Sequence, residues 1–387
     1  FQNEVRNASM WHEFPVSVGP GRDPIVVMAP KEALPRDLRV HLRGNRFQLG
    51  AVSPRGIPGI FRRPSAVGAA DDSGFAGVPA PFATTGGSGR LELARWIGAP
   101  DNPLTPRVVV NRIWQQHFGR GLVATSDNFG TRGEAPSHPE LLDWLARRFL
   151  EERMSLKALH RRILGSATFR RSTAAPASFA ADPENRWLAR HPRRRLAAEQ
   201  LRDAILAASG RLDRTPGGDS SAKVLLEKAE DIGALIKPNR LAADDPSYGQ
   251  SMRRSLYLPQ VRNMLPDVLA LFDAADPNGV TAARNETTVA SQALFLLNSP
   301  FVAAQAAAFA ASLLDGAAAD DAARVDLACR RAFGRPAAPD EIAEALAFLA
   351  DRTAGTAESP DAATRRAAAW QAWCHTLLCS AEFAYLE

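Results

Sequence analysis

Histidine, carboxylate and arginine side chains gather around one glycine-rich loop in the first half of the chain, residues 119–136. A histidine paired with a carboxylate suits general acid–base catalysis, while arginine suits an anionic group on a substrate or ligand. The candidates at this loop are Arg112, His117, Asp127, Arg132, Glu134 and His138. These residue types predict a polar site near the loop, which an enzyme or a binding module could use.

A structural interpretation of the same loop is simpler, and we favour it. Asparagine, aspartate and glycine are the residues that turns demand, and arginine and glutamate brace or solvate loops. Loop composition alone rarely identifies a site. No HxxH or HExxH spacing accompanies the histidines, so we expect no metal site here.

A second polar cluster precedes the apolar segment 291–314. It consists of Arg284, Asn285 and Glu286, and Arg254 lies upstream as a further candidate for holding an anion. Such a cluster could point into a cleft. We favour a network that caps the start of the following helix, because Thr287 and Thr288 are natural cap residues.

Two helices must position the first cluster. Thr105 and Pro106 predict an N-cap and first helical residue, and this helix should end at Gly119. After the loop, Ser137 and Glu140 fit a capping box at the start of the second helix. The loop therefore spans two well-marked helix ends.

The remaining pattern predicts a mainly α fold, a multi-helix bundle-like domain with a small β-containing N-terminal appendage. Residues 1–64 form β and irregular structure at the tail of a preceding domain, with a half-buried strand at 38–42. Residues 65–89 are rich in Gly, Ala, Ser, Pro and Thr and are expected to form a linker. Residues 90–387 form the helical domain, with helices expected at 156–164 (capped by Ser155), 196–209 (ending at Gly210), 291–314, 321–333, 339–350 and 362–383.

Charge and cysteine content exclude several classes of protein. The net charge is +5 and the isoelectric point about 9.4, but the basic residues are spread along the chain and accompany no nucleic-acid motif. The densest run, Arg193 to Arg195, is expected to brace a helix end or to pair with carboxylates. The cysteines, Cys329, Cys374 and Cys379, are too few for a disulfide framework, and no CxxCH motif is present for covalent haem. No apolar run is long enough to span a membrane.

Several stretches resemble the family called domain of unknown function 1553, from large planctomycete and related bacterial proteins. They are NPLTPRVVVNRIWQQHFGRGLV (102–123), FGTRGEAPSHPELLDWLA (129–146), LHRRILGSATFRRS (159–172), ADPENRWL (181–188), PRRRLAAEQLRDAIL (192–206), NETTVASQALFLLNSPF (285–301) and AFGRPAAPDE (332–341). Residues 26–60 look like the tail of the companion domain that precedes it. The resemblance implies an exported protein, located in the periplasm or at the cell surface, whose upstream cytochrome domain would carry haem c. It supplies no reaction and no catalytic residues.

Two functions remain open from the sequence. The first is a non-catalytic ligand-binding or scaffold module of a larger exported, cytochrome-associated protein, which contacts its own upstream domains and recognises polysaccharide or a cell-surface protein. Trp114, Trp144 and the arginines are suited to such contacts. The second is a hydrolytic or oxidative enzyme with its site around residues 117–138. The chain begins at Phe1 without methionine, so we expect a fragment or a processed product.

Overall fold

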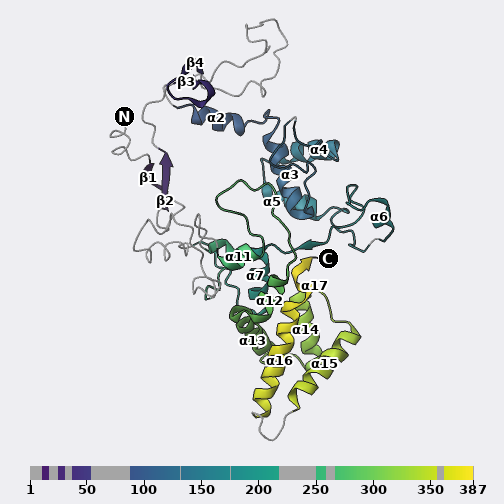
Figure 1. The fold of residues 1–387 in the computed structure, drawn as a ribbon. Helices are drawn as coiled ribbons and strands as arrows, with labels where there is room; N and C mark the ends of the chain where they lie inside the picture. Colours follow the sequence, from purple (N-terminus) through teal and green to yellow (C-terminus); the bar gives the residue numbers. More distant parts are fainter. Residues whose placement is uncertain are drawn as a thin grey trace. The chain divides into compact units, whose positions relative to one another are not determined.

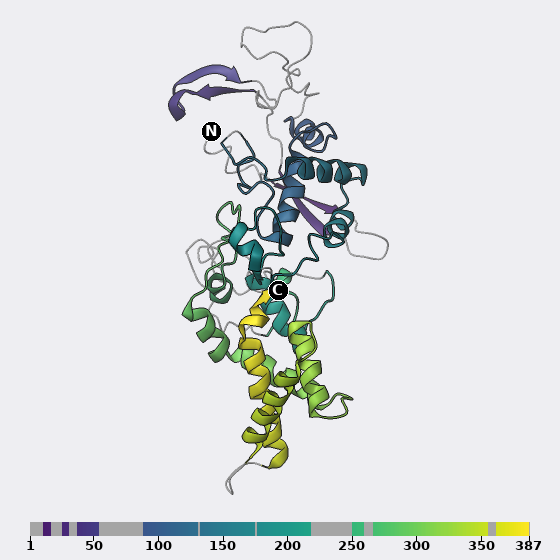
Figure 2. The same ribbon diagram turned by 90° about the vertical axis from the view of Figure 1, so that its right-hand side faces the viewer.

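The computed structural model describes residues 37–53, 88–130, 132–174, 176–217, 250–258, 266–354 and 361–386, with the backbone of strands β1 (Trp11–Val16) and β2 (Ile25–Pro30). The chain divides into two compact units, Phe1–Arg107 and Val108–Glu387. Most of the predicted linker, up to residue 87, lies outside the described residues. Figures 1 and 2 show the fold in two views.

The first unit carries the small β part that the sequence predicts. Antiparallel pairs join β1 to β2 and β3 (Leu38–His41) to β4 (Leu49–Ser53), and helix α2 (Arg90–Ile97) follows. The half-buried strand was a wrong prediction, because every residue of β3 is exposed. The alternation of apolar and polar residues determines which side chains share a face of the strand. That face is buried only where another element of the fold packs against it. None of the described residues of this unit joins a hydrophobic core cluster.

The second unit is helical, which confirms a mainly α fold. Its helices are α3 (Thr105–Phe118, which starts in the first unit), α4 (Pro139–Glu151), α5 (Leu156–Leu164), α6 (Pro176–Ala181), α7 (Ala198–Ala208), α11 (Asp267–Leu271), α12 (Ala290–Asn298), α13 (Pro300–Leu314), α14 (Asp321–Phe333), α15 (Pro339–Thr353), α16 (Ala362–Cys379) and α17 (Ala381–Ala384). A short 3-10 turn, Ser255–Tyr257, precedes α11. A two-residue pair joins β5 (Arg194–Arg195) to β6 (Tyr385–Leu386).

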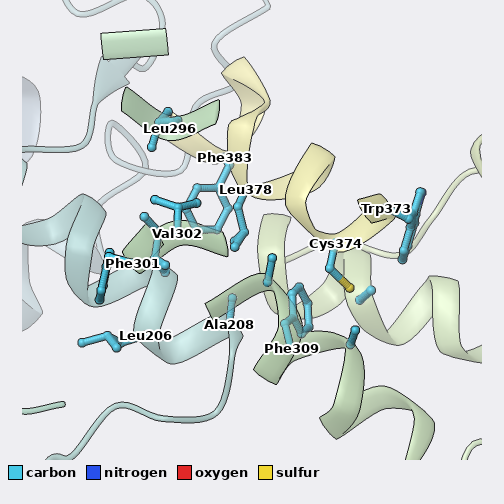
Figure 3. Packing of buried hydrophobic residues seen from close by; sticks show 14 of the residues in the cluster. Leu206, Ala208, Leu296, Phe301, Val302, Phe309, Trp373, Cys374, Leu378 and Phe383 are labelled. Atoms are coloured by element: carbon cyan, nitrogen blue, oxygen red, sulfur yellow. The ribbon is translucent and has the colours of Figure 1, made fainter. Parts of the chain in front are cut away.

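The C-terminal helices form a bundle around one apolar core. Helix α16 packs along α13 and α15, and Trp370 and Phe309 are both fully buried in that core. Figure 3 shows Phe309 of α13 in this cluster with Trp373 and Leu378 of α16. Cys374 lies among them, and burial raises the pKa of its thiol, so it acts as an apolar packing residue. The wide apolar face predicted for residues 362–383 is therefore a core stripe.

A second core lies where α3, α4 and α5 meet. Val110 and Trp114 of α3 pack with Phe149 of α4 and Ile163 of α5, and all four are buried. The Trp114 ring stacks on Phe118, with 4.3 Å between ring centroids. This core fixes the C-terminal half of α3, the part of the helix that carries the candidate residues.

The helix ends test the predicted caps. Three predicted caps are confirmed. Gly119, with a φ of 79°, ends α3, and Gly210, with a φ of 77°, follows α7. The Ser155 side chain accepts a hydrogen bond from the Ala158 amide at the start of α5. At the start of α3, however, the capping acceptor is the Asn102 side chain, which binds the Thr105 amide at 3.0 Å.

The predicted capping box at Ser137 and Glu140 was wrong. Helix α4 starts at Pro139, with His138 in the N-cap position and no side-chain cap. The Ser137 hydroxyl donates instead to the Leu122 carbonyl at 3.2 Å. A partner distant in sequence outcompetes the local cap in this case, which a sequence pattern cannot reveal.

The predicted single helix over 291–314 is two helices, α12 and α13, which bend by 54°. Pro300 opens α13, and proline disfavours helical geometry in the residue before it, here Ser299. Thr287 and Thr288 do not cap α12, whose N-cap is Val289. Among the described helices, none is long and apolar enough to cross a membrane alone. Only the bent pair of α12 and α13 has the required length and apolar composition when the two helices are taken together.

Candidate functional site

A cavity of about 500 Å³ opens in the second unit between three segments. The C-terminal half of α3 forms one wall, β5 with the first turn of α7 a second, and the chain from Phe272 to Glu286 a third. The polar lining consists of Arg112, Gln115, Gln116, Arg194, Arg195, Glu199, Gln200, Asp273, Thr281, Arg284, Asn285 and Glu286. Amides and charged groups of both signs therefore converge on one hollow.

Arg195 and Asp273 form the most buried ion pair of this lining. Arg195 Nη2 lies 2.6 Å from Asp273 Oδ2, and only 8% and 13% of the two side chains are exposed. Arg195 Nη1 also donates to the Thr287 carbonyl and to Gln292 Oε1, the latter at 3.1 Å. The arginine thus joins β5 to α12 and to the chain after α11.

Asp273 remains ionised in this setting. Burial would raise the pKa of its carboxyl, but hydrogen bonds from Thr287 and Arg195 outweigh burial and lower it. The Thr287 amide donates to Asp273 at 2.8 Å. Asp273 also has a φ of 61°, a left-handed conformation that aspartate tolerates better than most residues. It is a structural anion rather than a proton donor.

At the rim of the cavity, Arg284 binds Glu199 through both guanidinium nitrogens. The distances are 2.5 Å from Nη1 to Oε2 and 3.0 Å from Nη2 to Oε1. This bidentate pair fixes the loop before α12 against the first turn of α7. Two of the four lining arginines are therefore already neutralised.

The other two lining arginines keep donors available. Arg112 is exposed, and among the described residues it has no ion-pair or hydrogen-bond partner. Arg194 donates to the Gln116 carbonyl near the end of α3, but no described carboxylate forms an ion pair with it. Burial lowers the pKa of the Arg194 guanidinium, and Glu286 opposes that shift. The cavity therefore presents two cations with free hydrogen-bonding capacity.

Helix α3 is tied to the rest of the site by its amide side chains. Gln115 donates to the Ala282 carbonyl at 3.3 Å and accepts from the Ser126 hydroxyl at 2.7 Å. Asn111, fully buried, binds both the amide and the carbonyl of Val123, at 2.8 and 2.9 Å. Gly121 is required beside it, because a Cβ there would lie 2.5 Å from the Val123 carbonyl oxygen. These side chains of α3 thus brace the 119–136 loop.

His117 turns away from the cavity and faces α5. Its Nε2 lies 2.8 Å from His160 Nδ1, and its ring meets Phe169 edge-on at 5.7 Å. Burial, together with the charges of His160, Arg194 and His191, lowers the pKa of His117. One ring therefore donates to the other, and His117 stays neutral at neutral pH.

We expect the stability of the chain to fall as the pH drops from about 7.5 to about 5.5. The folded state lowers the pKa of His117 below its ordinary 6.5, so the unfolded chain binds the proton more readily. This contribution is fully present above 6.5 and is lost as the pH falls from that value through the lowered folded-state pKa. Urea unfolding at both pH values measures the effect.

His117→Gln should weaken this pH dependence, although His191, whose pKa burial also lowers, retains part of it. His41→Gln, at an exposed strand position, serves as the matched control and should behave like the wild type. Equal pH dependence in wild type and His117→Gln would contradict the assignment.

The structure brings together only part of the predicted candidate set. Arg112, Arg284, Asn285 and Glu286 line the cavity. Asp127 and Arg132 are exposed on the loop, and Glu134 pairs with Arg120 at 3.4 Å. His138 contacts the Trp187 ring, and the Arg254 guanidinium lies over Tyr257.

The cavity also contains residues that the candidate list omitted: Gln115, Gln116, Arg194, Arg195, Glu199 and Asp273. One signal for them was present, the run Arg193 to Arg195, and its predicted role is confirmed. Arg194 braces the end of α3, and Arg195 pairs with a carboxylate. Glu199 and Asp273 had no distinguishing local pattern.

Comparison with known proteins gives one match. A family model described as PSD1, protein of unknown function (DUF1553), matches residues 89–349. No curated protein and no solved structure matches the chain. The match covers most of the described helical residues, including every residue that lines the cavity.

Proposed function

The chain belongs to the DUF1553 family, and from that premise we propose that it is a non-catalytic module that binds an acidic polysaccharide. The observation that carries the proposal is the cavity in which neither Arg112 nor Arg194 forms an ion pair with a described carboxylate. Arginine is the residue best suited to carboxylate and sulfate groups, because its planar guanidinium can bind them through two parallel hydrogen bonds.

The rest of the lining suits a sugar better than a small inorganic anion. Gln115, Gln200 and Asn285 supply amides, and Glu286 supplies an acceptor for hydroxyl groups. The volume of about 500 Å³ exceeds what a single sulfate or carboxylate fills, and lies within the usual range of about 300–1,000 Å³ for ligand sites. A sugar unit with one acidic substituent matches both the size and the polarity.

The arrangement favours binding over hydrolysis. Glycoside hydrolysis needs one carboxyl group that is protonated at working pH and a second that is free to react. Glu199 and Asp273 are both held by arginines, and the pKa of Asp273 is lowered. The histidines and carboxylates of the 117–138 loop do not line the cavity.

The two tryptophans suggested by the sequence do not supply the sugar contacts. Trp114 is 4% exposed and belongs to the core of α3, α4 and α5. The face of Trp144 is occupied by Arg148 and Arg162, whose guanidinium carbons lie 5.7 and 5.4 Å from the ring centroid. We therefore assign the binding role to the arginine cavity.

The setting of the module is also part of the proposal. We place it in a larger exported protein, in the periplasm or at the cell surface, with an upstream cytochrome domain that carries haem c. The support is the likeness of the whole motif series to planctomycete proteins of that architecture. The sequence itself contains no CxxCH, so covalent haem would belong to the upstream domain.

Dextran, carboxymethyl-dextran and dextran sulfate provide the direct test, because they share one backbone and differ in charge. Isothermal titration should show binding to a charged dextran, weakening as salt rises, and none to neutral dextran. Binding to neutral dextran with equal affinity, or to none of the three, would overturn the proposal. The basic chain could also attract polyanions nonspecifically, and the Arg112 variants in the Discussion control for that.

A further inference from the structure

We propose that the binding surface continues from the arginine cavity to Trp187, so that the ligand is an extended polysaccharide chain and not a single sugar. This inference rests on the proposed function. It adds a second contact region, the Trp187 platform, which consists of Trp187, Arg186 and His138.

Trp187 is 67% exposed, unusually so for the largest apolar side chain. Its ring meets His138 edge-on, with 5.9 Å between centroids and an interplanar angle of 80°. One edge of the indole is therefore supported while a large part of its surface stays open. The flat apolar surface of an indole can contact the C–H face of a sugar ring, and its N–H can donate to a hydroxyl.

The loop that carries Trp187 is held firmly from within. The Asp182 carboxylate accepts from the Arg186 and Trp187 amides at 2.9 and 2.7 Å. Asn185 and Leu188, on either side, have left-handed φ angles of 51° and 55°. Such conformations persist only where the surrounding contacts enforce them.

Arg190 supplies much of that enforcement. It is 5% exposed, and its guanidinium donates to the carbonyls of Asp182 and Pro183 at 2.8 and 2.6 Å and to Ser178. Asn185 closes the loop by donating to the Arg190 carbonyl at 2.8 Å. Because the loop is already ordered, Trp187 would lose little conformational entropy when a ligand binds.

A small hollow lies next to the Trp187 platform, because Arg186 of the platform lines it. It measures about 60 Å³ and is lined by Arg120, Glu134, Glu184 and Arg186, among others. Arg120 holds the two carboxylates, at 3.4 Å from Glu134 and 3.1 Å from Glu184. All three side chains are substantially exposed, so hydroxyl groups of a ligand can reach them.

Residues next to each other in the chain line the two hollows. Gly119 lines the arginine cavity and Arg120 the small hollow, and consecutive Cα atoms lie only about 3.8 Å apart. Pro192 lines the small hollow, and Arg194, two residues further along the chain, lines the arginine cavity. Gly119 and Arg194 also touch, since a Cβ on Gly119 would lie 3.3 Å from Arg194 Nε. The linings of the two hollows thus adjoin at the C-terminal end of α3, which is where the proposed ligand passes from one to the other.

The order of charges along this surface selects the kind of chain. The two arginines without an ion pair, Arg112 and Arg194, line the cavity, carboxylates held by Arg120 line the hollow, and an aromatic ring ends the series. A sugar chain in which acidic and neutral units alternate fits that order. Single-stranded nucleic acid also stacks on tryptophan, but its unbroken phosphate charge would be repelled by Glu134 and Glu184.

Hyaluronan oligosaccharides test the inference, because glucuronate and a neutral amino sugar alternate along them. Isothermal titration should show that the hexasaccharide binds about tenfold more tightly than the disaccharide, a gain worth one good aromatic contact. Trp187→Ala should remove that gain without weakening disaccharide binding, and Trp187→Phe should restore part of it. Trp144→Ala, at another exposed tryptophan, should keep the full gain.

The outcomes separate this inference from the proposed function. If the charged dextrans and the disaccharide bind but length and Trp187→Ala have no effect, the extended surface is overturned and the cavity stands. If the charged dextrans bind but no hyaluronan oligosaccharide does, the extended surface is also overturned. If neither the charged dextrans nor the hyaluronan oligosaccharides bind, the proposed function is overturned. Displacement of the hexasaccharide by oligothymidylate at lower concentration would assign the surface to nucleic acid instead.

Discussion

Replacing Arg195 by methionine should lower the free energy of unfolding by about 3–5 kcal/mol. Its side chain is only 8% exposed and holds Asp273 at 2.6 Å, so the variant would leave a buried carboxylate without its cation. The loss should exceed that of any exposed ion pair in the chain, which contributes about 0–1 kcal/mol. Urea or guanidinium unfolding followed by circular dichroism measures it.

A second substitution separates the buried charge from lost packing. In the double variant Arg195→Met with Asp273→Asn, the uncompensated charge is gone, while asparagine still accepts from Thr287 and tolerates the left-handed φ of 61°. We expect the double variant to recover part of the lost stability. A loss below about 1 kcal/mol in the single variant would contradict the structural role of this pair.

Substitution of Arg112 should produce the largest change in ligand affinity that leaves folding intact. Arg112→Gln removes a charged hydrogen bond worth about 1.5–3 kcal/mol, which corresponds to roughly 10- to 150-fold weaker binding of an acidic oligosaccharide. Arg112→Glu should bring it below detection. The side chain is exposed on α3 without a described partner, so the melting temperature should stay within about 1 °C of the wild type.

Arg147→Gln is the matched control for this prediction. Arg147 is exposed on α4, lies outside the cavity lining, and has no ion-pair partner in the described part of the chain. The Arg147→Gln substitution removes the same positive charge as Arg112→Gln, so the nonspecific attraction of polyanions falls equally in both variants. Equal affinities for Arg112→Gln and Arg147→Gln would show that binding follows net charge and not the cavity.

Local signals in the sequence predicted most of the helices, because their causes lie within a few residues. Ser155 and Gly210 act through neighbouring amides and backbone angles, and their roles are readable without tertiary structure. Ser137 failed as a cap because its hydroxyl finds Leu122, 15 residues away. The bend between α12 and α13 was signalled by Pro300, but the continuous apolar run concealed it.

The candidate site was only partly predictable, because its pairs join distant parts of the chain. Arg195 and Asp273 form an ion pair although they are 78 residues apart in the sequence, and Arg284 and Glu199 do so at a separation of 85 residues. Loop 119–136 drew attention through its composition, yet that composition serves turns and braces such as Thr125 with Glu134. Trp187 was overlooked because no sequence pattern distinguishes an exposed tryptophan from a buried one such as Trp114.

Hydrogen exchange with and without hyaluronan hexasaccharide tests the central claim most directly, since it locates the ligand on the wild-type chain. Bound ligand should slow exchange at residues 112–119, 194–200 and 272–286, the three segments that line the arginine cavity. Protection of those segments is the result we expect from the arginine cavity, and protection of the loop around Trp187 as well is the result we expect from the extended surface. Protection elsewhere, for instance around the separate hollow lined by Met252, Phe295 and Phe301, would contradict the assignment of the binding site to the arginine cavity.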